Sequence, residues 1–142
     1  MHTCKMCDFQ GAVINKVIKR WRMIIPPKPA DLSGYVILTP IEHKENWSEI
    51  TVEEYQEAAS LLREIEKALN SKSALERLYT VTISEEVRHL HIHVIPRYKD
   101  RNLKGVDLIK YATQAPPAPE NEENNTDFSH ALITEIFNNM KA

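Results

Sequence analysis

Hydrophobic and polar residues alternate strictly over residues 89–94, whose sequence is HLHIHV. Successive side chains of a β-strand point to opposite faces, so this alternation predicts a strand with one apolar face and one face of imidazole rings. A rise of about 3.3 Å per residue would place neighbouring histidines roughly 6.6 Å apart and the outer two roughly 13 Å apart at their Cα atoms. One metal ion is therefore not expected to bind all three rings, and at least one histidine remains available for other chemistry.

Four other segments have the composition of short strands. Two of them lie between residues 11 and 26, the second near Trp21–Ile25, and the others cover Tyr35–Thr39 and Leu78–Ile83. They are rich in β-branched and bulky apolar residues and are bounded by proline, glycine or polar residues, as strands commonly are. The proline-rich segment Pro26–Pro29 cannot continue a central strand and is therefore expected to be a loop.

One long helix is predicted after residue 51. Residues 51–54, TVEE, have the spacing of a capping box, in which a threonine and a glutamate three residues later cap the start of a helix. The apolar side chains that follow recur at helical spacing: Tyr55, Ala58, Ala59, Leu62, Ile65 and Leu69. A helix with one apolar stripe packs on a sheet, and its glutamates are expected to face solvent. The pattern predicts an α/β (α+β) fold in which strands flank one amphipathic helix, without establishing the strand order.

The last third of the chain has weaker patterns. Residues 106–111 are expected to form a short helix or an edge strand, and residues 114–127, rich in proline, asparagine and glutamate, an extended linker. Apolar residues at helical spacing predict a final helix over residues 128–142, packed on the core or on a second subunit. The expected organisation is one domain over residues 1–113, the linker and the C-terminal helix.

The composition is that of an ordinary soluble domain. The 142 residues carry a net charge of −2, with 42% hydrophobic and 27% charged residues, and this balance does not indicate nucleic acid as a partner. No segment approaches the roughly 20 apolar residues of a membrane span, and no early apolar run resembles a signal peptide. These features predict a cytoplasmic protein that binds neither nucleic acid nor membranes.

The chain has two cysteines, Cys4 and Cys7, spaced as Cys-x-x-Cys. In a reducing compartment this spacing indicates metal binding or redox chemistry more than a structural disulfide. A redox motif is expected to follow a strand, and here three residues precede Cys4. Two cysteines supply half of a tetrahedral zinc site, so the other two ligands would have to come from distant parts of the chain. Two incidental thiols remain the alternative interpretation.

Residues 89–97, HLHIHVIPR, resemble the histidine-triad signature His-φ-His-φ-His-φ-φ, in which φ is apolar. That signature identifies the HIT superfamily of nucleotidyl hydrolases and transferases, and this chain is similar to its zinc-containing bacterial members. The resemblance covers about Cys4–Arg97. It implies a HIT-like fold, with a mainly antiparallel five-stranded sheet per protomer and one long helix packed on it. It also implies a homodimer as the usual assembly.

The same resemblance implies a set of zinc ligands. His43 follows the third predicted strand and its proline, at a place where many HIT proteins have a zinc ligand. Cys4, Cys7, His43 and His89 would then form a Cys2His2 site. Four nitrogen and sulfur ligands leave no open coordination position, which is the arrangement of a structural zinc. Such an ion would hold the N-terminus and the loop after the third strand against the histidine segment.

The resemblance also implies a mechanism. The middle histidine, His91, would attack the α-phosphorus of a nucleotide and form a covalent nucleotidyl-histidine, which water or another acceptor then resolves. His93 would contact the phosphate or hold His91 in its reactive tautomer. Dinucleoside polyphosphates, nucleoside phosphoramidates and nucleotide sugars all present such an α-phosphate, so the residues do not distinguish among these substrates, or a hydrolase from a transferase.

Two positions depart from the family pattern. Many HIT proteins place Gln-Ser or Gln-Thr, in contact with phosphate, where this chain has Glu85 and Glu86. Two carboxylates at a substrate-binding position would repel a phosphate unless a cation offsets them or they point away. The departure favours one alternative, a non-catalytic nucleotide-binding or interaction module with the HIT fold. The His-x-His spacing leaves a second alternative open, a metalloenzyme in which pairs of the three histidines hold a catalytic ion.

Overall fold

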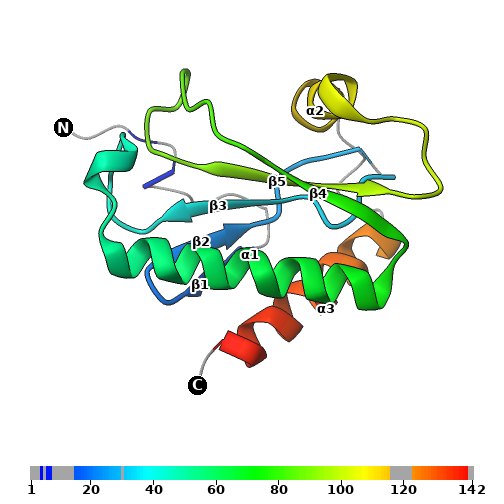
Figure 1. The fold of residues 1–142 in the computed structure, drawn as a ribbon, viewed down its shortest axis with the longest axis horizontal. Coiled ribbons are helices and arrows are strands. Elements are labelled where there is room, and N and C mark those ends of the chain that lie inside the picture. The colour runs from blue at the N-terminus through cyan, green and yellow to red at the C-terminus, as the bar shows by residue number, and fades with distance from the viewer. Residues whose placement is uncertain (1–3, 5, 8–14, 30, 116–122, 141–142) are drawn as a thin grey trace.

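The computed structural model describes residues 4, 6–7, 15–29, 31–115 and 123–140 (Figure 1). Its centre is a five-stranded sheet with the strand order β1-β2-β3-β5-β4, in which every neighbouring pair is antiparallel. The strands are β1 (Asn15–Ile18), β2 (Trp21–Ile24), β3 (Val36–Pro40), β4 (Leu75–Val81) and β5 (Ile92–Tyr98). The predicted fold class is confirmed. Residues 11–14 of the first predicted strand segment lie outside the described residues.

The strand that carries the histidines is shorter than the alternation predicted. β5 begins at Ile92, so His93 lies in the sheet while His89 and His91 precede it. The Leu90 N–H donates to the Lys44 carbonyl at 2.7 Å, and the Thr39 hydroxyl donates to the Leu90 carbonyl at 2.8 Å. These bonds attach residues 89–91 to the loop after β3 instead of to a strand ladder. β4 likewise spans Leu75–Val81, earlier than the predicted Leu78–Ile83, because the preceding helix runs almost directly into it.

The capping box starts the long helix α1 (Val52–Lys72) as predicted. The Glu54 N–H donates to the Thr51 hydroxyl at 3.1 Å, and the Glu54 carboxylate accepts from the Thr51 N–H at 2.8 Å. The buried face, however, is rotated from the predicted stripe, because Tyr55 is 41% exposed and Ala59 is exposed. The side chains buried on α1 are Glu54, Ala58, Leu61, Ile65, Ala68 and Leu69.

Burial of Glu54 corrects the expectation that the helix glutamates face solvent. Its side chain is 2% exposed and forms an ion pair with Lys44, a residue of the loop that also holds the histidine segment. The Trp21 indole N–H donates to the Glu54 carbonyl at 2.8 Å. The partners of the buried carboxylate are thus the Lys44 ammonium and the Thr51 N–H, while the Trp21 bond ties the helix backbone to β2.

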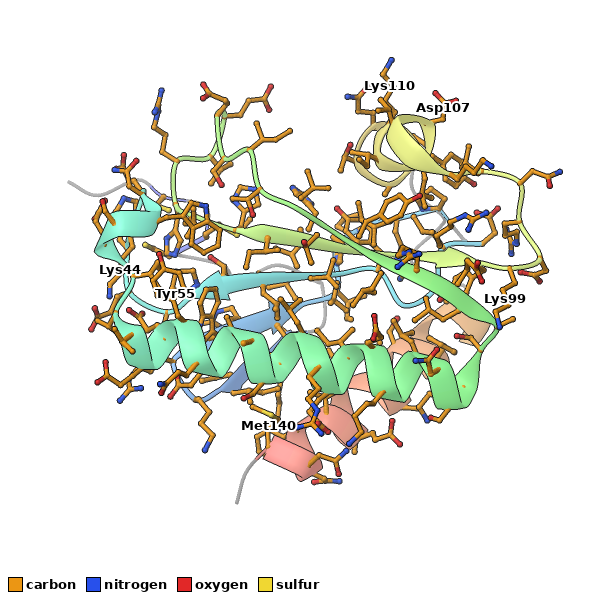
Figure 2. All side chains as sticks on the ribbon, in the orientation of Figure 1. Lys44, Tyr55, Lys99, Asp107, Lys110 and Met140 are labelled. Carbon is orange, nitrogen blue, oxygen red and sulfur yellow. The ribbon has the colours of Figure 1, made fainter. Side chains whose placement is uncertain are left out.

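Helices cover both faces of the sheet. α1 packs on one face together with α3 (Glu123–Met140), whose Leu132 and Ile136 are fully buried, so the C-terminal helix docks on the core of its own chain. On the other face, α2 (Gly105–Gln114) buries Leu108 and Ala112 over one end of the sheet, while Asp107 and Lys110 point away from it (Figure 2). A single 3-10 turn, η1 (Trp47–Glu49), precedes α1.

At the C-terminal end, the segment expected to be a short helix or an edge strand is the helix α2. The boundary of the last helix differs, because α3 begins at Glu123, before the predicted residue 128. Residues 116–122 of the predicted linker lie outside the described residues. Within the described part of the chain, no helix is long and apolar enough to cross a membrane.

Gly34, just before β3, occupies a position that other residues fit poorly. Its φ is +96°, and a Cβ there would lie 2.7 Å from the Tyr98 hydroxyl oxygen and 2.8 Å from a Leu69 methyl carbon.

Gly34→Ala is therefore expected to lower the free energy of unfolding by about 2–4 kcal/mol, since backbone strain and overpacking add. Urea unfolding measures this loss. Gly105→Ala is the matched control, because Gly105 has φ +64° but no atom within 4 Å of its Cβ position. Equal losses in the two variants would contradict the packing part of the argument.

Candidate functional site

The predicted site residues converge at one end of the sheet. His89 and His91 lie on the segment that enters β5, His43 lies on the loop after β3, and Cys4 and Cys7 come from the N-terminal segment. The bonds from Leu90 to Lys44 and from Thr39 to Leu90 place the loop after β3 beside the histidine segment. Residues more than 80 positions apart in the sequence are thereby brought into contact.

The four predicted metal ligands form one cluster. The ligand atoms of Cys4, Cys7, His43 and His89 all lie within 4.8 Å of one another. The Cys7 Sγ is 3.2 Å from the His89 Nδ1 and 3.4 Å from the His43 Nδ1, and the Cys4 Sγ is 3.5 Å from the His89 Nδ1. Zinc–sulfur bonds of about 2.3 Å and zinc–nitrogen bonds of about 2.0 Å at tetrahedral angles separate S from N by roughly 3.5 Å. The cluster therefore fits a four-coordinate metal of the zinc type.

Hydrogen bonds around the cluster orient both imidazole rings. The His89 Nε2–H donates to the Pro40 carbonyl at 2.7 Å, and the His43 Nε2–H donates to the Glu45 carboxylate at 3.1 Å. Each ring thus presents its Nδ1 lone pair to the cysteines, as metal-binding histidines commonly do. Burial acts to raise the pKa of the Cys4 thiol, but hydrogen bonds from the Cys7 backbone and side chain lower it below its ordinary value. The donor set is therefore prepared for a cation.

His91 is held in one tautomer by the segment that precedes it. Its Nδ1 lies 2.8 Å from the His89 carbonyl oxygen, which can only accept, so the Nδ1 carries the proton and the Nε2 has a free lone pair. The ring is 8% exposed, and no described residue hydrogen-bonds to its Nε2. A neutral imidazole with one unprotonated nitrogen can act as a nucleophile or a base.

Ser84 contributes to the same arrangement and was missed by the sequence reasoning. Its hydroxyl accepts from the His91 backbone N–H at 3.2 Å and lies 3.3 Å from the His91 Nδ1. Its φ of +53° is unusual for a residue other than glycine. The turn between β4 and β5 thus carries local backbone strain directly beside His91.

His93 lies on β5 next to His91, with ring centroids 5.1 Å apart. Its Nδ1 is 2.7 Å from the hydroxyl oxygen of Tyr35, a residue that the sequence reasoning also missed. Burial and the neighbouring His91 lower the pKa of His93 to about 4, so the ring is neutral at physiological pH. The site therefore presents the neutral ring of His93 beside the ring of His91.

The family is decided by comparison with known proteins. The model of the HIT domain matches residues 22–100, more than half of the chain, and this range contains His89, His91 and His93. The chain belongs to the HIT domain family. No curated protein sequence matches it significantly.

Solved structures of HIT proteins share the fold of this chain. A Zn-bound histidine triad family protein from Mycobacterium smegmatis is 18% identical, with a TM-score of 0.67 over 93% of this chain and 94% of that one. A hypothetical histidine triad nucleotide-binding protein from Sulfolobus tokodaii is 18% identical, with a TM-score of 0.66 over 97% and 94%. A histidine triad protein from Sinorhizobium meliloti is 22% identical, with a TM-score of 0.65 over 87% and 89%. At these identities the likeness establishes the HIT fold.

Glu85 and Glu86 lie in the turn between β4 and β5, which projects from the body of this HIT protein (Figure 1). Both side chains are exposed. The Glu85 carboxylate is 4.0 Å from the Arg88 guanidinium, so a cation partly offsets its charge. Ser84, the residue immediately before them in the sequence, contacts His91 through its hydroxyl.

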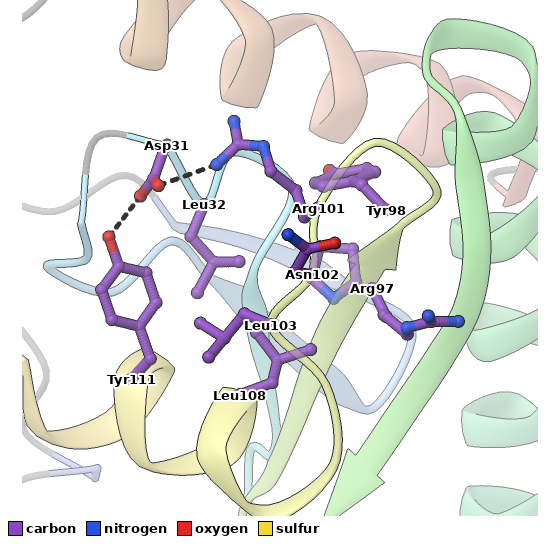
Figure 3. A pocket seen from close by; sticks show the side chains of 10 residues that line it. Asp31, Leu32, Arg97, Tyr98, Arg101, Asn102, Leu103, Leu108 and Tyr111 are labelled. Atoms are coloured by element: carbon purple, nitrogen blue, oxygen red, sulfur yellow. Dashed lines mark hydrogen bonds and ion pairs between the residues drawn. The ribbon is translucent and has the colours of Figure 1, made fainter.

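A separate cavity lies at the other end of β5 (Figure 3). It measures about 200 Å³ between β5 and α2, and none of the three histidines lines it. The Asp31 carboxylate on its rim accepts from the Arg101 guanidinium at 2.7 Å and from the Tyr111 hydroxyl at 2.5 Å. These bonds connect the loop before β3 to α2 and stabilise this end of the HIT domain.

Proposed function

We propose that this HIT protein is a nucleotidyl hydrolase or transferase that acts on the α-phosphate of a nucleotide through a covalent nucleotidyl-histidine. The observation that carries the proposal is the 2.8 Å bond from the His91 Nδ1–H to the His89 carbonyl, which leaves the His91 Nε2 lone pair free. Membership of the HIT family and the adjacent neutral ring of His93 support it. The Sulfolobus relative is a hypothetical nucleotide-binding protein, which agrees with this substrate class.

The proposed reaction has two displacements at phosphorus. The His91 Nε2 attacks the α-phosphorus, and the bond to the leaving group breaks, so that the leaving group departs with the electron pair and takes up a proton from solvent. Water, or another acceptor, then attacks the same phosphorus and releases one proton to solvent, while the phosphorus–nitrogen bond breaks and returns its electron pair to Nε2. Splitting one difficult displacement into two easier ones is the advantage of a histidine nucleophile. His93 would stabilise the charge on a phosphate oxygen.

We also propose that Cys4, Cys7, His43 and His89 hold a structural zinc ion. Two thiolates and two imidazole nitrogens close a tetrahedral shell, so the ion would stabilise this end of the fold without binding substrate. His89 links this site to the chemistry, because its ring faces the cysteines while its carbonyl orients His91. The Zn-bound Mycobacterium relative supports the choice of metal.

The assembly and the cellular location that we propose rest on the family resemblance. We propose a cytoplasmic homodimer, consistent with β4 at one end of the sheet order and with exposed apolar side chains such as Val52 on α1. We also propose the division into a HIT domain over residues 1–113, a linker over 114–127 and a C-terminal segment over 128–142. The described part of α3 packs on the core, which argues for its folding together with the domain.

A non-catalytic nucleotide-binding module is the second candidate function. The exposed carboxylates of Glu85 and Glu86 beside the histidine site favour it, because they would disfavour a highly charged leaving group at close range. In that case the protein would bind nucleotides without forming a covalent intermediate.

Intact-protein mass spectrometry after rapid mixing distinguishes the two functions. The substrates are a dinucleoside polyphosphate, a nucleoside phosphoramidate and a nucleotide sugar, with an alkaline quench because acid cleaves phosphorus–nitrogen bonds. We expect a mass increase of one nucleotidyl group with at least one substrate, mapped by peptide analysis to His91, and release of free nucleotide on longer incubation. Protein denatured before mixing is the control. Nucleotide binding without adduct or turnover would assign the non-catalytic function.

A further inference from the structure

We propose that Tyr35 is a positioning residue for His93, because its hydroxyl holds the His93 ring in the tautomer that carries the proton on Nε2. The inference rests on the proposed function, in which His93 contacts the substrate phosphate. Its structural basis is the distance of 2.7 Å between the Tyr35 hydroxyl oxygen and the His93 Nδ1. Tyr35 is only 2% exposed, so the contact is protected from water.

The register of the sheet explains how a tyrosine reaches this ring. Ile37 of β3 lies directly opposite His93 of β5, so their side chains share the face of the sheet that α2 partly covers. Tyr35 is two residues before Ile37 and therefore lies on the same face, diagonal to His93, within reach of a long aromatic side chain. Gly34, whose φ of +96° and lack of a Cβ allow the chain to pass close to Tyr98 and Leu69, sets the backbone path into Tyr35.

The direction of the hydrogen bond follows from the surroundings of the hydroxyl. Burial raises the pKa of Tyr35, so its oxygen keeps a proton to donate. Among the described residues, the His93 Nδ1 is the single hydrogen-bond partner of this hydroxyl. If the Nδ1–H donated instead, the buried hydroxyl proton would have no acceptor in the described structure, which is costly. The hydroxyl therefore donates, and the neutral His93 ring carries its own proton on Nε2.

This tautomer is the one that a phosphate requires. Phosphate oxygens accept hydrogen bonds, so an Nε2–H can stabilise the negative charge, whereas an Nε2 lone pair would repel it. His91 is held in the opposite tautomer by the His89 carbonyl, with its proton on Nδ1. Two adjacent imidazoles are thus given different roles, nucleophile and donor, by two different partners: a backbone carbonyl and a tyrosine hydroxyl.

Imidazole nitrogen NMR of the substrate-free protein tests the tautomer directly. In the wild type we expect His93 to show a protonated Nε2 and an unprotonated Nδ1, and in Tyr35→Phe a mixture of the two tautomers. Tyr79→Phe is the matched control: Tyr79 lies on the same face of β4 and its hydroxyl accepts from the Gly105 N–H at 2.8 Å. A wild-type ring protonated on Nδ1, or an unchanged tautomer in Tyr35→Phe, overturns the inference whether or not the protein is an enzyme.

Ligand binding gives the second readout. The probes are the four common nucleoside 5′-monophosphates and the nucleoside that corresponds to the tightest binder, measured by calorimetry. Tyr35→Phe is expected to weaken monophosphate binding about three- to tenfold, the factor for one neutral hydrogen bond, and to leave nucleoside binding unchanged. Equal weakening of both ligands would show a merely structural role and overturn the inference. Absence of any monophosphate binding in the wild type would instead overturn the proposed function, and the NMR result would still decide the tautomer.

Discussion

His91→Ala is expected to lower kcat for nucleotide release by about 10⁴-fold or more, and to abolish the nucleotidyl adduct. The reason is that the substitution removes the atom that attacks phosphorus, and losing a covalent nucleophile leaves only the catalysis supplied by binding and electrostatics. The KM is expected to change much less, because the proposed contact of His93 with the phosphate remains. Steady-state kinetics with the substrate that gives the largest adduct measures the effect.

Two controls separate chemistry from folding in this experiment. His130→Ala removes an exposed histidine on α3, outside the site, and is expected to keep wild-type kinetics. The melting temperature of His91→Ala is expected to stay within a few degrees of the wild type, because the His89 carbonyl that loses its partner can accept from water in the space left. Residual activity near the wild-type level in a folded His91→Ala protein would exclude the covalent mechanism.

Removal of metal with a chelator is expected to lower the melting temperature by about 10–15 °C. A ligand whose free concentration is several hundred times its Kd stabilises the folded protein by roughly 3–4 kcal/mol. In a chain of about 140 residues this free energy corresponds to a change in melting temperature of about 10–15 °C. Differential scanning calorimetry measures the shift, and elemental analysis should find one zinc per chain. Activity is expected to fall in parallel, because the His89 carbonyl orients His91 only while the segment around it is held.

Variants of the ligands provide the matched control for chelation. Cys4→Ser and Cys7→Ser are expected to melt near the temperature of the chelated wild type and to respond little to chelator. Added Zn²⁺, but not Mg²⁺, should restore the wild-type protein, because thiolate and imidazole ligands favour zinc. A chelator that abolishes activity without changing the melting temperature would instead indicate a catalytic metal, the alternative left open by the histidine spacing.

The elements whose signals are local could be predicted from the sequence. The capping box of residues 51–54 predicted the start of α1, because its hydrogen bonds join residues three apart. The alternation around His93 predicted a strand, and the HIT resemblance of the same residues implied the family, which the comparison confirmed. The same resemblance implied a metal cluster of Cys4, Cys7, His43 and His89, and the structure brings their ligand atoms together.

Features that depend on contacts between distant segments could not be predicted in this way. The apolar stripe of α1 was misplaced because Glu54 is buried, and its burial depends on Lys44 and on the β2 residue Trp21. β5 starts later than the alternation suggested, because Leu90 bonds to the loop after β3 instead of to a neighbouring strand. Alternation identifies which side chains lie on the same face of a strand. The neighbouring segment determines at which residue the hydrogen-bonded pairing between two strands ends.

The tautomers at the site were decided entirely by tertiary structure. The residue type makes an imidazole available at positions 91 and 93, but either ring nitrogen of each could carry the proton. The bond from His91 to the His89 carbonyl and the placement of Tyr35 diagonal to His93 arise from the path of the chain into β5 and from the β3–β5 register. Local sequence specifies periodicity and caps through short-range hydrogen bonds, whereas the chemistry of this site depends on which distant donor or acceptor each histidine meets.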